Sequence, residues 1–334
     1  MTDDLDDLDA VTRLTKDLKL ASVTLSIPEV RFLVDSYYSM QDDRKRADNQ
    51  VRALNTSGEP HDVLNWLLEN SRTLENQIKR ALDAYSNGVP LGQWARSICG
   101  IGPVLAAGLL AHINVENAPT VGRIWRFAGY DPTVIWHSKD NAKKMVTQAM
   151  DGKKKVDADV VAAAAKLADR TVDQLERTRV FFQKIKKEGA TEKGWTQDML
   201  ASTIAVRPWN ARLKTLCWKI GESFVKVKGK EEDFYGKVYE KRKEYETAKN
   251  DKGDYKGQAD AGLKRVGRST EAYKHYKNGK LPPGRIHERA KRYAVKLFLA
   301  HYHDRGLTLL GKVPPLPYPI AHMDHAHFIP APGA

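Results

Sequence analysis

The sequence predicts an all-α protein. Three observations indicate this class. Apolar residues recur at helical spacing over long stretches, Pro and Gly stand where helices start and end, and almost no stretch resembles a strand. Only Leu307–Leu310 has a short apolar run that resembles a strand. At 334 residues the chain can bury a sizeable core in two or three compact units.

Composition restricts the partners and the compartment. The formal net charge is +13, and such a surplus points to nucleic acid or another anionic surface. No run of about 18 apolar residues is present, so we expect no membrane span. The acidic start of the chain is the opposite of a secretory signal, and two cysteines suggest no disulfide framework. We therefore expect a cytoplasmic, DNA-associated protein.

We expect four parts along the chain. Residues 1–25 form an acidic disordered tail, because clustered like charges repel and no apolar strand flanks them. Residues 26–88 form a helical arm, and residues 90–312 form a basic helical domain. Residues 313–334 form an extended tail rich in Pro and His.

Two amphipathic helices predict the arm. Ser26 followed by Pro28 is a typical helix start, and the first helix should run to about Leu54. In the second helix, apolar residues from Val63 to Leu82 share one face. The pair predicts an antiparallel hairpin or coiled coil. Both a purely structural stalk and pairing with a second copy remain open.

Residues 97–111 predict a helix, a tight turn and a second helix that begins with Pro. Gly100 and Gly102, on either side of Ile101, permit positive φ and leave backbone N–H groups uncovered. A phosphate can then approach those groups and the positive end of the following helix. We expect a helix-hairpin-helix in which these three residues and Val104 bind a nucleic-acid backbone. An ordinary helical corner is the alternative.

Basic residues should widen this interface. Residues 207–312 contain 27 Lys and Arg against 13 Asp and Glu, and the helix at 284–301 separates its basic face from an apolar stripe. The stretch from 136 to 156 is lysine-rich and predicts a mobile basic excursion. Solvated surface charge is the alternative for every one of these residues. The candidate contacts are Arg123, Arg126, Lys143, Lys144, Arg285, Arg289 and Arg292.

Three histidines near the end of the chain, His322, His325 and His327, raise the question of a divalent metal. Their spacing matches no closed structural site, and no cysteine accompanies them. We therefore expect a packed or hydrogen-bonded histidine cluster and no cofactor.

The order of these motifs resembles the C-terminal domain of the bridge-RNA-guided insertion-sequence transposases. The helical pair at 28–86 is similar to the coiled-coil arm that precedes the hairpin in that family. The segments that carry the resemblance are 98–110, 127–132, 210–213, 234–241 and 289–297.

The resemblance also implies what this chain lacks. In that family a RuvC-like domain with four acidic residues precedes the arm, and together with a serine of the C-terminal domain it cuts and joins DNA. Only about 25 residues precede the arm here, too few for such a domain. The serine nearest to the family position is Ser138, which is followed by Lys139 rather than by Gly. Ser138 is thus the catalytic candidate, without a base that the sequence identifies.

Together these observations predict a DNA-binding protein that grips the backbone with little sequence specificity and performs no catalysis. An RNA partner remains open, because backbone contacts alone do not distinguish the two nucleic acids. Two alternative functions also remain open. One is a serine-dependent strand-transfer protein that needs a catalytic partner, and the other is a structural assembly protein that oligomerises through its arm.

Overall fold

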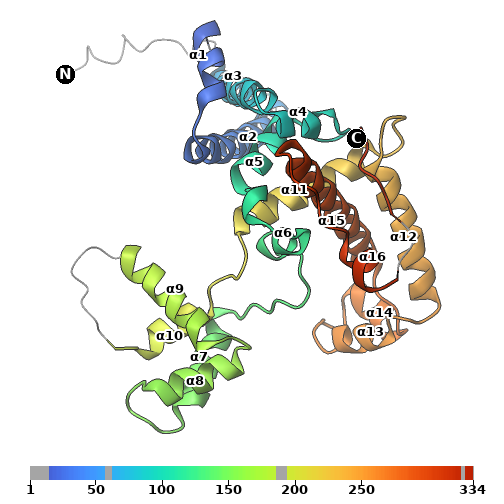
Figure 1. Ribbon diagram of the computed structural model, residues 1–334. Helices are drawn as coiled ribbons and strands as arrows, with labels where there is room; N and C mark the ends of the chain where they lie inside the picture. The colour runs from blue at the N-terminus through green and yellow to red at the C-terminus, as the bar shows by residue number, and fades with distance from the viewer. Residues whose placement is uncertain (1–14, 57–61, 186–193, 325–327, 334) are drawn as a thin grey trace. The chain divides into compact units, whose positions relative to one another are not determined.

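The computed structural model describes residues 15–56, 62–185, 194–324 and 328–333 (Figure 1). Helices make up 71% of the structure, with no strand among the described residues, so the all-α prediction is confirmed. No helix in these ranges is both long enough and apolar enough to cross a bilayer. The predicted strand at Leu307–Leu310 is wrong, because the last long helix continues through Leu309.

The chain forms two compact units, and each is described by itself. Unit 1 contains residues 1–125 and 215–334, and unit 2 contains residues 126–214. The chain leaves unit 1 within α6 (Val121–Phe127) and returns to it within α11 (Ala211–Val227). The arm and the C-terminal third therefore belong to one unit, a grouping that the linear division of the sequence did not predict.

The arm of unit 1 consists of α2 (Ile27–Thr56) and α3 (Asp62–Asn87), which pack along one another. They run antiparallel, because Val30 near the start of α2 shares a core cluster with Leu82 near the end of α3. Glu29 accepts hydrogen bonds from the backbone N–H and hydroxyl of Ser26, at 2.7 and 2.6 Å, and so caps the start of α2. Before the arm lie α1 (Lys16–Ala21) and the 3-10 turn η1 (Ser22–Thr24).

Two short helices follow the arm, α4 (Pro90–Ser97) and α5 (Pro103–His112). Helix α5 packs against both arm helices, and nearly all its residues are buried. It also closely approaches α11, since a Cβ atom added at Gly108 would lie 2.8 Å from Leu216. The 3-10 turn η2 (Val115–Asn117) leads from α5 to α6. Helix α5 is thus held on several sides by the core of unit 1.

The C-terminal part of unit 1 contains α12 (Tyr235–Asp251), α13 (Lys256–Leu263), α14 (Glu271–Lys277) and α15 (Pro283–Leu309). Helices α12 and α15 lie side by side (Figure 1). Phe298 of α15 stacks on Trp94 of α4 and meets Phe224 of α11 and Tyr235 of α12 edge-on. This aromatic cluster joins the helix before the hairpin turn to the C-terminal helices.

Unit 2 contains α7 (Lys139–Met150), α8 (Ala158–Leu167), α9 (Val172–Ile185) and α10 (Gln197–Ile204) around a core of its own. The predicted mobile excursion at 136–156 is wrong for most of its length, since α7 occupies twelve of those residues. Ala142, Val146 and Met150 recur every four residues and are buried, while the lysines between them face outward.

The end of the chain carries α16 (Tyr318–His322) and a segment at 328–333 that contacts unit 1. The indole N–H of Trp94 donates to the carbonyl oxygen of Pro332 at 3.2 Å. Nε2 of His301 lies 2.8 Å from the carbonyl oxygen of Ile329. The extended tail predicted at 313–334 therefore contains one short helix and a docked end.

Candidate nucleic-acid interface

The turn between α4 and α5 has a positive φ at the first of its two glycines, Gly100, but not at the second, Gly102. The N–H of Ile101 donates to the carbonyl oxygen of Ile98 at 3.0 Å and closes the turn. Gly100, the third residue of that turn, has φ +94°, which a type II turn requires and side chains disfavour. A Cβ atom at Gly100 would also lie 3.2–3.3 Å from Val227, Phe224 and Ser223. The first glycine is thus needed for both the backbone conformation and the packing against α11.

Two side chains hold this turn in place. Arg96 donates to the carbonyl oxygen of Ile101 at 3.0 Å and, through its other terminal nitrogen, to Asp83 at 3.0 Å. The hydroxyl of Ser223 on α11 donates to the carbonyl oxygen of Gly100 at 2.5 Å. The carbonyl groups of Gly100 and Ile101 therefore point into the protein, where each accepts a hydrogen bond.

The second glycine has a different environment. Gly102 is the N-cap of α5, in an extended conformation with φ −82° and ψ 175°, and no side chain caps the helix. A Cβ atom added there would meet no heavy atom within 4 Å. Hydroxyl side chains cap α7, α10 and α14, whereas α4, α12, α13 and α15 lack a side-chain cap as α5 does. The first turn of α5 therefore keeps N–H groups without an intrahelical partner beside open space.

The side chains of Ile101 and Val104 belong to the core, with 2% and 6% of their surface exposed. In the predicted interface, Ile101 and Val104 could therefore contact a phosphate only through their backbone N–H groups. A shallow depression at the turn is lined by residues 96–102 together with Glu232. Its two charged side chains, Arg96 and Glu232, have opposite signs, so the turn itself is close to neutral. Positive charge for a phosphate must come from its surroundings.

Helix α11 supplies such charge beside the turn, and the sequence analysis missed it. Lys219, Ser223 and Lys226 follow one another at intervals of four and three residues, so they share the face of α11 that contacts Gly100. That spacing was visible in the sequence. The sequence could not show that this face lies beside the turn, because the contact between Ser223 and Gly100 depends on tertiary packing.

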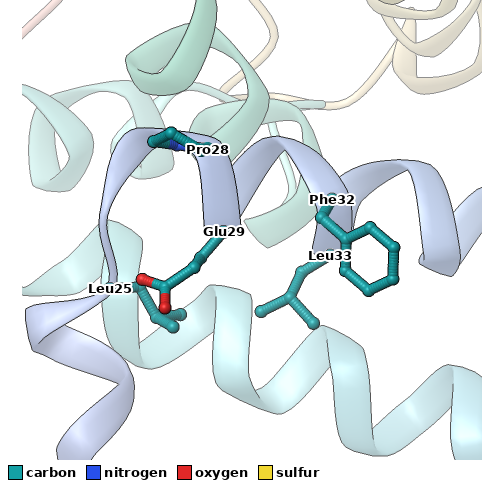
Figure 2. A pocket seen from close by; sticks show the side chains of 5 residues that line it. All are labelled: Leu25, Pro28, Glu29, Phe32 and Leu33. Atoms are coloured by element: carbon teal, nitrogen blue, oxygen red, sulfur yellow. The ribbon is translucent and has the colours of Figure 1, made fainter.

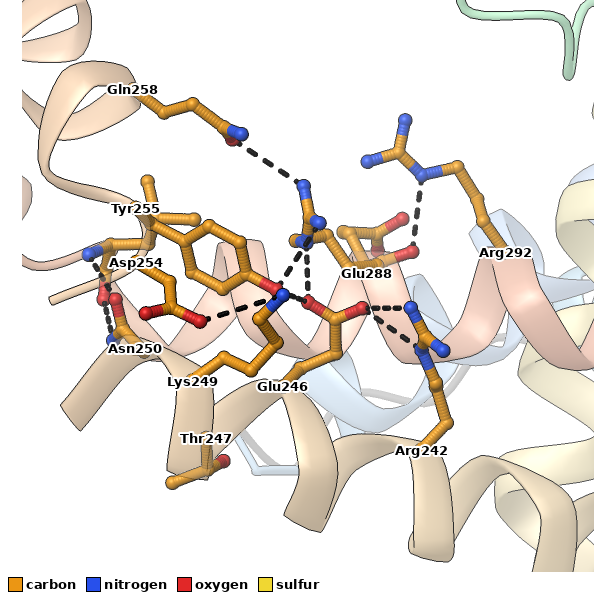
Figure 3. A network of polar contacts seen from close by, with 12 residues as sticks. Arg242, Glu246, Thr247, Lys249, Asn250, Asp254, Tyr255, Gln258, Glu288 and Arg292 are labelled. Carbon is orange, nitrogen blue, oxygen red and sulfur yellow. Dashed lines mark hydrogen bonds and ion pairs between the residues drawn. The ribbon is translucent and has the colours of Figure 1, made fainter. Parts of the chain in front are cut away.

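The predicted arginines of unit 1 fall into two groups. Arg123, Arg285 and Arg292 are exposed and form no ion pair with any residue that the structure describes. Arg289 instead donates to the buried carboxylate of Glu246 at 2.6 Å and covers the ring of Tyr255. Its guanidinium is therefore bound within the protein, and Figure 3 labels the two residues that it contacts, Glu246 and Tyr255. A phosphate would have to compete with a buried carboxylate for it.

In unit 2, Arg126, Lys143 and Lys144 are exposed, the last two on α7. Ser138 is the N-cap of α7, and its hydroxyl accepts the N–H of Asn141 at 3.3 Å. The neighbouring His137 has its Nε2 3.2 Å from the carbonyl oxygen of Ala168. Ser138 thus has a structural role, and the nearest imidazole in sequence contacts a carbonyl group instead of the hydroxyl.

The structure brings together two of the segments that carry the resemblance. Within unit 2 the N–H of Asn210 donates to the carbonyl oxygen of Phe127 at 2.8 Å. Gly129, at φ +70°, lets Trp209 approach, since a Cβ atom there would lie 2.9 Å from the indole. Lys214 in turn lies 3.9 Å from the ring of Trp209. The segments 127–132 and 210–213 therefore form one packed contact.

Metal-binding side chains gather at one place in the described part of the chain. Glu222, His287 and Glu288 each offer a ligand atom within 4.8 Å of the other two. The ammonium group of Lys291 already pairs with both carboxylates, at 2.6 Å from Glu288, so their charge is compensated by the protein. Of the three predicted tail histidines, His322 lies in α16, and His325 and His327 lie outside the described residues.

Comparisons of this chain with protein-family models, with curated proteins and with solved structures found no match.

Proposed function

We propose that the protein binds the sugar–phosphate backbone of nucleic acid, with the turn between α4 and α5 as the central contact and with little preference for sequence. The observation that carries this proposal is the uncapped start of α5 beside open space at Gly102. Uncapped N–H groups at the positive end of a helix form a ready site for a phosphate oxygen. The net charge of +13 supplies long-range attraction for the same partner.

The resemblance to the transposase C-terminal domain supports DNA as the partner, with RNA as the second substrate to test. Contacts of this kind position a protein on the backbone and carry no base information. We assign no chemical step to Ser138, because its hydroxyl caps α7. A serine without an activating base is a poor nucleophile. A covalent adduct with DNA that disappears in Ser138→Ala would contradict this part of the proposal.

Gly102→Val tests the hairpin directly. The variant should fold, because extended backbone accepts any residue and the added side chain meets no heavy atom within 4 Å at its Cβ. The valine methyl groups should block a phosphate from the start of α5. Binding to labelled duplex DNA and duplex RNA across a salt series should weaken alike for all sequences, and wild-type affinity should fall steeply as salt rises.

A matched control is Gly257→Val in α13, where an added Cβ atom also meets nothing within 4 Å. This variant should bind like the wild type. Unchanged affinity in a folded Gly102→Val protein would remove the hairpin from the proposal. Binding that is absent or insensitive to salt in the wild type would overturn the proposed function as a whole.

Exposed apolar residues on the arm favour a second candidate function, structural assembly through self-association. Phe32 on α2 and Trp66 on α3 expose 70% and 63% of their surface. Figure 2 shows Phe32 beside Leu33, Leu25 and Glu29 at an open groove near the start of α2. Large exposed apolar side chains at such a groove are typical of interaction surfaces. The salt series separates the two functions, because apolar self-association lacks the steep loss of affinity with salt.

A further inference from the structure

Lysines flank the residue of α11 that contacts the hairpin turn. Ser223 donates to Gly100, and Lys219 lies one turn before it while Lys226 lies almost one turn after it. Neither lysine forms an ion pair with a residue in the described ranges. Many surface lysines of this unit do form one, for example Lys274 with Glu271 and Lys280 with Asp251. Among the described residues, Lys219 and Lys226 are therefore free of such a carboxylate partner, and what sets them apart is their place on either side of the residue that contacts the turn.

Helix α2 adds a third lysine to the same place. The ammonium group of Lys219 lies 3.6 Å from the ring centroid of Tyr38, and Lys45 follows Tyr38 two helical turns later on α2. Asp42, between them in sequence, lies 3.7 Å from Lys45 and is the acid that faces this group. Lys219 and Lys226 on α11 and Lys45 on α2 thus supply three positive charges where α2 approaches α11, and Asp42 supplies one negative charge.

The electrostatics of Lys219 support this arrangement. Burial lowers its pKa, and the positive charges of Lys45 and Lys226 lower it further, against the opposing effect of Asp42. The two neighbouring lysines therefore add a positive field at Lys219, which Asp42 offsets in part. A bound anion would relieve that field.

We propose that Lys219, Lys226 and Lys45 form a second phosphate-binding site beside the hairpin turn, which binds a further phosphodiester group of the same duplex backbone. This inference rests on the proposed function. The ligand is a backbone phosphate because lysine ammonium groups act as point charges for phosphate, and no base-reading geometry is required. Lys219 covers one face of the Tyr38 ring, so that face cannot stack a base, and we take a duplex rather than a single strand as the ligand.

The double variant Lys219→Gln with Lys226→Gln tests this site on the full-length protein. The slope of log affinity against log salt should become shallower by about 2 on duplex DNA, because each lost phosphate contact removes about one unit. Lys274→Gln with Lys280→Gln removes the same formal charge from ion-paired positions and should leave the slope nearly unchanged. Duplex RNA and single-stranded DNA serve as parallel arms.

Each outcome has a separate meaning. If both double variants flatten the slope equally, the effect is one of net charge alone and the second site is wrong. If the wild type binds, and Gly102→Val weakens binding while Lys219→Gln with Lys226→Gln does not, this inference fails but the hairpin stands. If the wild type shows no salt-dependent binding, both fail. The single variant Lys226→Gln, at an exposed position near the end of α11, should still reduce the slope by about 1 if the double variant does not fold.

Discussion

At the residue scale, the carboxylate of Glu246 is a buried charge, since only 1% of the residue's surface is exposed. It accepts hydrogen bonds from Tyr255 at 2.5 Å, from Arg289 at 2.6 Å and from Arg242 at 2.9 Å (Figure 3). These donors come from α12, α15 and the start of α13. A buried carboxylate is stable only with such partners, and the removal of one member leaves the others uncompensated.

Glu246→Gln should therefore destabilise unit 1 by about 3 kcal/mol at neutral pH, the order expected when a buried ion pair is broken. Burial alone would raise the pKa of Glu246, but the hydrogen bonds from Tyr255, Arg289 and Arg242 hold it below its usual value. A depressed carboxyl pKa contributes stability that is present above the unfolded value and is lost as pH falls through the folded value.

The measurement is urea unfolding of wild type and variant between pH 7 and pH 3. The difference in free energy of unfolding between wild type and variant should become smaller as pH falls below the ordinary pKa range of a glutamate side chain. Glu244→Gln, at an exposed position of the same helix, is the control and should change stability little. If this difference in free energy of unfolding stays constant with pH, the charge of Glu246 is not what stabilises the contact between its helix and Arg289 and Tyr255.

Of the contacts of Glu246, the sequence indicates the one within its own helix but not the one to another helix. The pair Arg242 and Glu246 is visible as an i,i+4 spacing on one predicted helix. Arg289 comes from a helix more than forty residues away and was predicted as a phosphate contact instead. No local pattern distinguishes an arginine that faces solvent from one that meets a buried acid of another element, because that contact depends on tertiary packing.

At the element scale, local signals predicted the helices well where capping and apolar spacing agree. Ser26 and Pro28 marked the start of α2, and Gly100 marked the turn before α5. The helix α7 was not predicted from these signals. Lysines dominate its sequence, and its buried stripe consists of only three small or flexible apolar residues. The docking of residues 328–333 could not be predicted either, since Trp94 and His301 contact carbonyl groups of its backbone, which no side-chain pattern marks.

That docked segment carries a pH-dependent prediction. His301 has its Nδ1 2.8 Å from the hydroxyl of Tyr235 and its Nε2 2.8 Å from the carbonyl oxygen of Ile329, which suits a neutral ring with the proton on Nε2. Burial lowers the pKa of His301, against the opposing effects of the Ile329 carbonyl and Asp304. The resulting stability is present above the ordinary histidine pKa of about 6.5 and is lost as pH falls through the lower folded value.

Unit 1 should therefore lose stability between pH 7.5 and pH 5, and His301→Gln should lose less over the same range because glutamine does not titrate. Urea unfolding at the two pH values measures this difference. His275→Gln on α14 is the control and should keep the wild-type dependence. Equal pH dependence in His301→Gln and the wild type would mean that this histidine is not the titrating group.

At the scale of the whole molecule, the length of the sequence allowed two or three compact units, but the sequence did not predict where the chain divides. Residues 126–214 form their own core cluster, in which Leu200 is fully buried, while Leu299 is fully buried in unit 1. The sequence did not indicate this division, because the chain passes from one unit to the other inside helices α6 and α11. No Pro- or Gly-rich linker marks a boundary there.

Separate cores predict separate unfolding transitions. Leu200→Ala should lower the stability of unit 2 by about 2–5 kcal/mol, the usual cost of a cavity left by leucine, and Leu299→Ala should do the same to unit 1. Differential scanning calorimetry should show two transitions, each moved by one variant. A single transition shifted equally by both variants would mean that the units unfold together.

The same pair of variants separates the contributions of the units to binding. At a temperature where Leu200→Ala has unfolded unit 2 alone, the hairpin and the lysines of α11 remain folded in unit 1, whereas α7 no longer presents Lys143 and Lys144 on a fixed surface. Salt-dependent binding should then persist with a shallower slope. Under matched conditions Leu299→Ala should abolish binding at the turn. If Leu200→Ala instead abolishes all binding while unit 1 stays folded, the principal contact lies in residues 126–214 and the start of α5 is not the site.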